Sequence, residues 1–175
     1  VHDERLPLEA RRWVGGAEDA VAIARAAVQD ARLDLRELER WRDTLPRPGE
    51  LQTGADALSR PLQGLAKARL ALAEARLDQA DAELALSEAA LALVYAETDM
   101  RYDLGVYDLA GLRGARDEAR VALEARSVAV DEALVALDGA SGDFWSAYRQ
   151  QAGAGGGDDA LMWLPTERAT GLLAH

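Results

Sequence analysis

The sequence predicts an all-α protein built on a long antiparallel coiled-coil helical hairpin, with an additional N-terminal helix. Leucine recurs every seven residues at Leu70, Leu77, Leu84 and Leu91, which places a narrow apolar seam along one face of a helix. A glycine-containing break at residues 101–109 separates this segment from a second one with the same alternation. No stretch alternates with period two for long enough to predict a sheet.

A short amphipathic arm is expected at residues 1–16, where Gly15 and Gly16 stop the helical pattern because glycine favours helix ends and turns. A first long helix is expected at residues 17–45, since apolar residues recur there at spacings of three and four. Pro46 ends this helix, because proline cannot continue the hydrogen-bond ladder.

The second helix is expected to start at Ser59 as its N-cap, with Pro61 in the first turn, where its missing N–H is no loss. It should run to about Leu104. Asp108 is the expected N-cap of the return helix, which is expected at residues 109–138. The two helices then fold back along each other and share the apolar seam.

Gly139 and Gly142 are expected to break the return helix, and residues 151–157 read as a flexible glycine-rich linker. Beyond the linker, four large apolar residues predict a tail anchor that docks on another surface. They are Leu161, Met162, Trp163 and Leu164.

These elements predict one helical hairpin and bundle domain at residues 17–150. An N-terminal arm at residues 1–16 precedes it, and a linker and C-terminal apolar tail at residues 151–175 follow. The composition fits this reading, because 49% hydrophobic residues with only 5% aromatics indicate a core of small side chains between close helices.

The charge of −11 argues against nucleic acid as a partner, because phosphates would be repelled and the arginines alternate with acids along the helices. Charges also interrupt every apolar run well before the roughly 20 residues that a transmembrane helix needs. With no cysteine, the chain offers neither disulfides nor thiolate metal sites.

No catalytic, cofactor-binding or metal-binding residues are predicted. His2 and His175 lie at the chain ends, where no rigid shell of neighbours would hold them in place. Carboxylates such as Asp78 and Asp81 are expected on solvated helix faces, since bundle metal sites pair glutamates with histidines and no predicted helix carries one. The sequence therefore favours a noncatalytic role, with no cofactor.

The break and its flanks resemble the second half of a repeat in TolC-like outer-membrane efflux proteins. The residues that carry the resemblance are Arg101, Tyr102, Gly105, Asp108, Leu109, Leu112, Ala115, Arg116, Ala133 to Leu137, Gly139, Gly142 and Trp145. In that family, an aromatic residue and a glycine precede an Asp/Leu-rich turn onto an alanine-rich helix. Residues 46–52 are too short for the membrane strands that the family inserts there, so the resemblance implies a single helical-hairpin repeat without those strands.

The resemblance implies a noncatalytic helical-hairpin component of a bacterial envelope transport or channel assembly. Its partners would be copies of itself or a larger envelope protein complex, and its location the periplasm or the outer membrane. The alternative is a soluble coiled-coil scaffold or adaptor subunit unrelated to transport, located in the cytoplasm. An acidic helical enzyme subunit or ligand-binding bundle is the third and least favoured reading.

The hairpin tip is the candidate interaction site. Its predicted residues are Arg101, Tyr102, Asp103, Gly105, Tyr107 and Asp108. Gly105 is expected to supply a positive φ to the turn. With Asp99, the tip aspartates concentrate negative charge, which would line a pore if hairpins form a ring and would only cap helices in a single chain.

Overall fold

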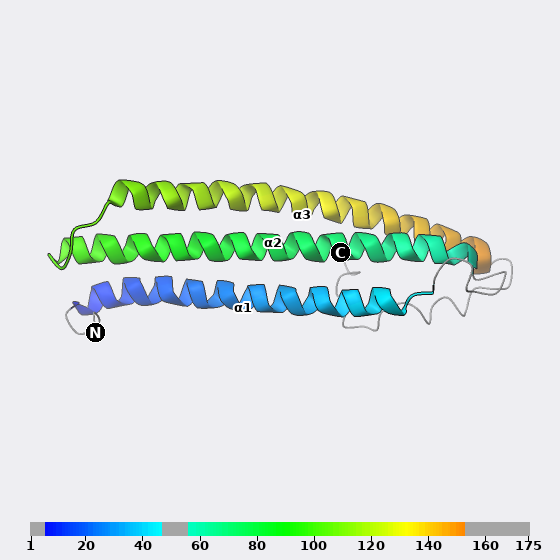
Figure 1. Cartoon of the computed structure of the whole chain (residues 1–175), viewed down its shortest axis with the longest axis horizontal. Coiled ribbons are helices and arrows are strands. Elements are labelled where there is room, and N and C mark those ends of the chain that lie inside the picture. Colours follow the sequence, from blue (N-terminus) through cyan, green and yellow to red (C-terminus); the bar gives the residue numbers. More distant parts are fainter. Residues whose placement is uncertain (1–5, 47–55, 153–175) are drawn as a thin grey trace. The chain divides into compact units, whose positions relative to one another are not determined.

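The computed structural model describes residues 6–46 and 56–152, which form three helices and no strand. These are α1 (Leu8–Thr44), α2 (Asp56–Arg101) and α3 (Leu109–Ala152) (Figure 1). The all-α fold, with α2 and α3 as an antiparallel hairpin and α1 as the additional helix, is confirmed. The predicted tail anchor, Leu161 to Leu164, lies outside the described residues.

The chain divides into two compact units that each take a stretch of every helix. Among the described residues, the first unit comprises 6–33 and 75–130, and the second comprises 34–46, 56–74 and 131–152. The hairpin tip belongs to the first unit. The largest buried side chains belong to the second.

In the first unit, α1 is aligned with α2 by three side-chain contacts that step by seven residues along both helices. They are Glu18 with Tyr95, Arg25 with Glu88 at 2.9 Å, and Arg32 with Asp81 at 3.6 Å. As the α1 number rises, the α2 number falls, so the two helices are antiparallel. Exposed pairs of this kind add little stability, but their repetition defines one register.

The other flank of α2 is aligned with α3 by a second antiparallel set of polar contacts. They are Asp78 with Arg126 at 3.3 Å, Gln79 with Ser127 at 3.2 Å, and Glu97 with Arg113 at 2.8 Å. Within the first unit, α2 therefore lies between α1 and α3 and is held by polar side chains along both flanks.

The second unit carries a denser apolar core. Leu58, Leu62, Leu65 and Leu72 of α2 and Phe144 of α3 are almost completely buried. Phe144 also packs edge-to-face on Trp145, with ring centroids 5.2 Å apart. A neighbouring cluster joins α1 to α2 through Leu38, Leu70 and Ala73.

Two predicted helix breaks do not occur. Helix α1 runs through Gly15 and Gly16, and α3 runs through Gly139 and Gly142. A glycine inside a helix costs only about 1 kcal/mol relative to alanine. Burial on both sides of each pair offsets this cost: Ala10 and Val21 flank the first pair, and Leu137 and Phe144 flank the second.

The observed bounds of the second helix also differ from the predicted ones. Helix α2 begins at Asp56, so Ser59 is not its N-cap and is buried inside the helix. Pro61 then lies beyond the first turn. At the other end α2 stops at Arg101 rather than Leu104, because the backbone turns away there.

Candidate interaction site at the hairpin tip

Helix α2 ends in a Schellman motif centred on Asp103. The N–H of Leu104 donates to the carbonyl of Asp99 at 2.8 Å, and the N–H of Asp103 donates to the carbonyl of Met100 at 3.4 Å. Asp103 has a φ of 56°, the left-handed conformation that this motif requires after the last helical turn. Aspartate tolerates this conformation better than most residues do.

The prediction that Gly105 supplies the positive φ is wrong, because Asp103 does so. Gly105 is needed for space instead. A Cβ atom at Gly105 would lie 2.7 Å from Cε2 of Tyr107, well inside van der Waals contact. The glycine therefore leaves room for the Tyr107 ring beside the turn.

Asp108 caps the N-terminus of α3, as the sequence predicts. Its Oδ1 accepts a hydrogen bond from the N–H of Gly111 at 3.0 Å, and its carbonyl accepts the first helical bond, from Leu112 at 3.1 Å. The carboxylate also lies at the positive end of the helix dipole. A Cβ at Gly111 would meet this carboxylate at 2.5 Å, so the close cap depends on that glycine.

Asp99 is not one of the exposed tip charges that the sequence suggests. Asp99 is 5% exposed, and its Oδ2 accepts a hydrogen bond of 2.6 Å from the Tyr107 hydroxyl. This bond, together with partial burial and the Asp99 charge, raises the pKa of Tyr107 above its usual 10.0. The pair joins the end of α2 to the segment that leads into α3.

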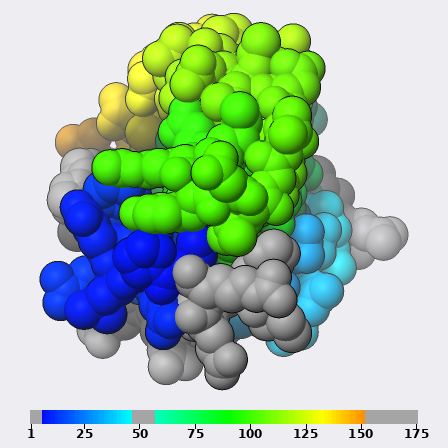
Figure 2. All heavy atoms as spheres, turned by 90° about the vertical axis from the view of Figure 1, so that its left-hand side faces the viewer, coloured from blue at the N-terminus to red at the C-terminus, as the bar shows by residue number. Residues whose placement is uncertain are grey.

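The start of α1 packs against the tip, a contact that the sequence analysis missed. Leu6, Ala10 and Val14 form a buried cluster on which Tyr102 and Leu104 pack. The Arg101 guanidinium also lies over the Trp13 ring, 5.2 Å from its centroid. Figure 2 shows this end of the first unit, with the α2–α3 connection in green beside the start of α1 in blue.

The predicted interaction residues at the tip differ in whether they shape the turn or are exposed to solvent. Tyr102 is half-buried, and Gly105 and Asp108 serve the turn and the cap. Arg101, Asp103 and Tyr107 remain exposed, as does the capping Asp108. Val106, which the sequence analysis did not single out, is 94% exposed and projects an apolar group from the same loop.

Replacing Tyr107 with phenylalanine should remove a pH-dependent contribution to stability. Because the pKa of Tyr107 is raised in the folded chain, the contribution is fully present below pH 10 and is lost as the pH rises through the folded value. Urea denaturation at pH 8 and pH 11 should show the wild-type advantage over Tyr107→Phe shrinking at pH 11. In an Asp99→Asn background this dependence should be much smaller, because the carboxylate acceptor and its charge are gone and only the effect of partial burial remains. A constant difference across both backgrounds would contradict the pairing.

The apolar seam of the first unit is incompletely covered. No α3 residue from Leu109 to Ala129 is buried, and the seam leucines Leu84 and Leu91 of α2 are half-buried. On the outer face of α3, Val121 and Val128 are 61% and 56% exposed and lie seven residues apart. The first unit therefore presents apolar surface both at its seam and on the outside of α3.

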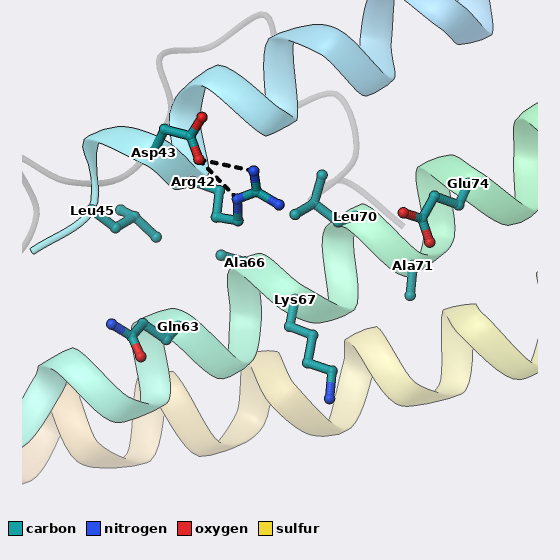
Figure 3. A pocket seen from close by; sticks show the side chains of 9 residues that line it. All are labelled: Arg42, Asp43, Leu45, Gln63, Ala66, Lys67, Leu70, Ala71 and Glu74. Carbon is teal, nitrogen blue, oxygen red and sulfur yellow. Dashed lines mark hydrogen bonds and ion pairs between the residues drawn. The ribbon is translucent and has the colours of Figure 1, made fainter. Parts of the chain in front are cut away.

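The described residues of each unit line a groove. In the first unit, a groove of about 360 Å³ runs over α2 and is lined mainly by alanine, leucine and isoleucine side chains, including Ile23, Leu86 and Leu123. In the second unit, a groove of about 690 Å³ lies between α1 and α2 (Figure 3). Its lining mixes charges of both signs, and its Arg42 already pairs with Asp43 at 2.8 Å.

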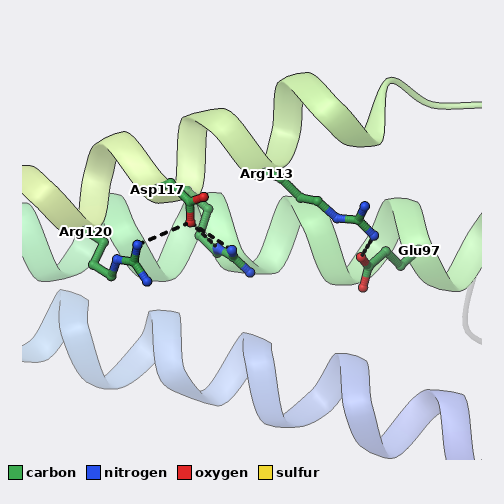
Figure 4. A network of polar contacts seen from close by, with 5 residues as sticks. Glu97, Arg113, Asp117 and Arg120 are labelled. Atoms are coloured by element: carbon green, nitrogen blue, oxygen red, sulfur yellow. Dashed lines mark hydrogen bonds and ion pairs between the residues drawn. The ribbon is translucent and has the colours of Figure 1, made fainter.

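The polar side chains of α3 in the first unit are mostly paired near the surface (Figure 4). Arg116 donates two hydrogen bonds to Asp117, and these bonds, with the charges of Arg116 and Arg120, lower the pKa of the Asp117 carboxyl. Within residues 6–46 and 56–152, no group of three histidine, cysteine or acidic residues could hold a metal ion.

None of the helices in the described part of the chain is long and apolar enough to cross a membrane. A scan against protein-family models and searches of curated proteins and of solved structures find no match to this chain.

Proposed function

We propose that this chain is a noncatalytic helical-hairpin component of a bacterial envelope transport or channel assembly, similar to TolC-like proteins. It works by packing its helices against copies of itself or against a larger partner, in the periplasm or at the outer membrane. The observation that carries the assembly role is the incompletely covered seam of the first unit. The envelope setting rests on the resemblance of the tip and its flanks.

Assembly is supported by the distribution of apolar side chains. In the first unit, the inward positions of α3 up to Ala129 are only half-buried, and its outer face carries the exposed Val121 and Val128. Apolar area is therefore exposed on both sides of this helix. Valines repeated every seven residues form a stripe suited to another helix. Side-by-side packing would cover the stripe and the groove near Ile23 and Leu123.

The assembly can be tested by analytical ultracentrifugation of the full chain. The wild type should sediment as an oligomer, and the double variant Val121→Glu, Val128→Glu should sediment as a monomer with its helicity unchanged by circular dichroism. The matched control is Ala22→Glu, Gln29→Glu, which adds the same charge at exposed positions seven residues apart on α1. The control should remain oligomeric.

A wild-type chain that stays monomeric at high concentration would contradict self-assembly. Fractionation of cells that make the native protein tests the setting separately. Recovery with the periplasm or outer membrane supports the envelope role. An oligomer found only in the cytoplasm would leave the assembly intact and replace that role with a scaffold unrelated to transport.

A further inference from the structure

The interface between α1 and α2 in the first unit has two unlike edges. Its centre on α1 is buried and consists of Val21, Ala24 and Val28. At about 100° per residue, the polar contacts that align the two helices all lie along one edge of this buried strip. The opposite edge borders the groove of about 360 Å³ over α2. That edge is apolar and open to water, since Ala20 is exposed and Ile23 is 71% exposed.

The groove side of α1 has the geometry of an unfilled hole in a helix interface. The four α1 residues that line the groove are Ala20, Ile23, Ala24 and Ala27. Their spacing of i, i+3, i+4 and i+7 is that of the residues that surround one knob of a facing helix. Two-helix interfaces commonly carry glutamate or lysine along their edges, whereas small apolar side chains here allow another helix to approach closely. Leu86 of α2 and Leu123 of α3 extend the apolar lining across the groove.

Carboxylates without a partner border this groove. Glu83 of α2 is the one charged side chain among the described residues that line it. Asp19 lies four residues before Ile23, and Asp30 lies three residues after Ala27, so both share the groove side of α1. Asp19, Asp30 and Glu83 are exposed, and none of them forms an ion pair or hydrogen bond with a described residue. The groove therefore combines an apolar lining with a negatively charged border.

We propose that this groove is the docking site for an amphipathic helix of another protein, one that carries lysine or arginine beside its apolar stripe. The stripe would fill the groove, as in other cases where a helix binds in a hydrophobic groove. The cations of the partner would lie against Asp19, Asp30 and Glu83, which the chain itself leaves unpaired. The inference rests on the proposed function, because it names the chemistry of the larger partner invoked there.

Another copy of the chain fits this groove less well. The exposed stripe of α3 in the first unit includes Val121, and Glu118 and Glu124 lie three residues to either side of it. Both glutamates are exposed and share the face of Val121. Packing this stripe into the groove would bring them toward the carboxylates at its border. Like charges would then oppose the contact that a basic partner would favour.

The test uses the full chain and a synthetic helical peptide of about four heptads, with leucine at positions a and d and lysine at positions e and g. The lysines keep the peptide from pairing with itself, and a second peptide has glutamate in place of every lysine. The chain is diluted until it sediments as a monomer, and its binding to each labelled peptide is followed by fluorescence anisotropy. The lysine peptide should bind saturably with one peptide per chain, and the glutamate peptide should not bind.

Filling the groove should abolish this binding. The variant Ala20→Arg, Ala27→Arg places two long cationic side chains in the groove, and its helicity should be unchanged because arginine favours helices. The matched control is Ala22→Arg, Gln29→Arg, which adds the same charge at exposed positions on the other side of α1. The control should still bind the lysine peptide saturably.

A second variant tests the charges and leaves the apolar lining intact. Asp19→Asn, Asp30→Asn, Glu83→Gln should weaken binding of the lysine peptide about tenfold and make the remaining affinity less sensitive to salt. Its control removes three other exposed carboxylates of the first unit and is Glu9→Gln, Glu118→Gln, Glu124→Gln. This control should bind nearly as tightly as the wild type.

Loss of binding confined to the two groove variants supports the proposal. The proposal is overturned if the lysine peptide does not bind, if both carboxylate variants weaken binding equally, or if Ala20→Arg, Ala27→Arg binds like the wild type. It is also overturned if that variant instead abolishes self-association at high concentration, which assigns the groove to another copy. The peptide measurements do not depend on whether the wild type assembles or where it is found in cells, so the proposed function can fail separately.

Discussion

Replacing Leu65 with aspartate should unfold the second unit at moderate temperature, the largest effect expected from any single change described. Leu65 is 1% exposed and lies among the buried leucines of α2. An aspartate there loses the apolar contacts and buries a charge without a partner. The cost should reach about 4–5 kcal/mol, which is comparable to the whole stability of many domains. Urea denaturation followed by circular dichroism measures it.

Leu84→Asp in the same helix is the matched comparison. Leu84 is only half-buried in the first unit, so the new carboxylate would reach water and the cost should be about 1–2 kcal/mol in a dilute, dissociated sample. Equal losses for the two variants would mean that burial is not concentrated in the second unit. A large loss for Leu84→Asp only at high protein concentration would indicate that assembly covers the seam.

Gly105→Val should dislodge Tyr107 and weaken the hairpin tip. A Cβ at this position would lie 2.7 Å from the Tyr107 ring, and the ring is held by its hydrogen bond to Asp99. Moving the ring breaks that bond and leaves a buried carboxylate without its hydroxyl donor. Overpacking of this kind costs about 1–3 kcal/mol. Urea denaturation gives the loss, and near-ultraviolet circular dichroism reports the changed tyrosine environment.

Two controls make the steric cause testable. Gly114→Val introduces the same side chain in α3, where a Cβ would meet nothing within 4 Å, and should leave stability nearly unchanged. In a Tyr107→Ala background, Gly105→Val should cost much less, because the ring that it would strike is gone. An undiminished loss in that background would show that the backbone, rather than the ring, rejects the valine.

The sequence was sufficient for the hairpin because its signals are local. Leucines seven residues apart imply one helix face wherever the chain goes, and Asp108 precedes an apolar run at the spacing of an N-cap. Seam periodicity does not reveal how deeply a position is buried. Ala66 and Leu70 are buried, whereas Leu84 and Leu91 on the same stripe are half-buried, because coverage depends on the neighbouring helices.

The features that were missed depend on contacts between distant segments. Gly15 and Gly16 look like a helix end until Val14 is seen to pack against the tip. Asp99 looks like a surface charge until the turn brings Tyr107 back to it. Arg69 is a charged residue in a helical pattern and therefore looks like a surface position. Only the fold shows that its side chain is buried.

The heptad-spaced contacts between α1 and α2 in the first unit oppose sliding of one helix along the other. Two of the three α1 positions are arginines, Arg25 and Arg32, and the third is Glu18. A displacement by one heptad in one direction would set Glu18 opposite Glu88, two like charges. The opposite displacement would leave Arg25 facing the hydroxyl of Tyr95 instead of a carboxylate. The uneven order of charges thus distinguishes the native alignment from its two nearest equivalents, which the apolar repeat alone would tolerate.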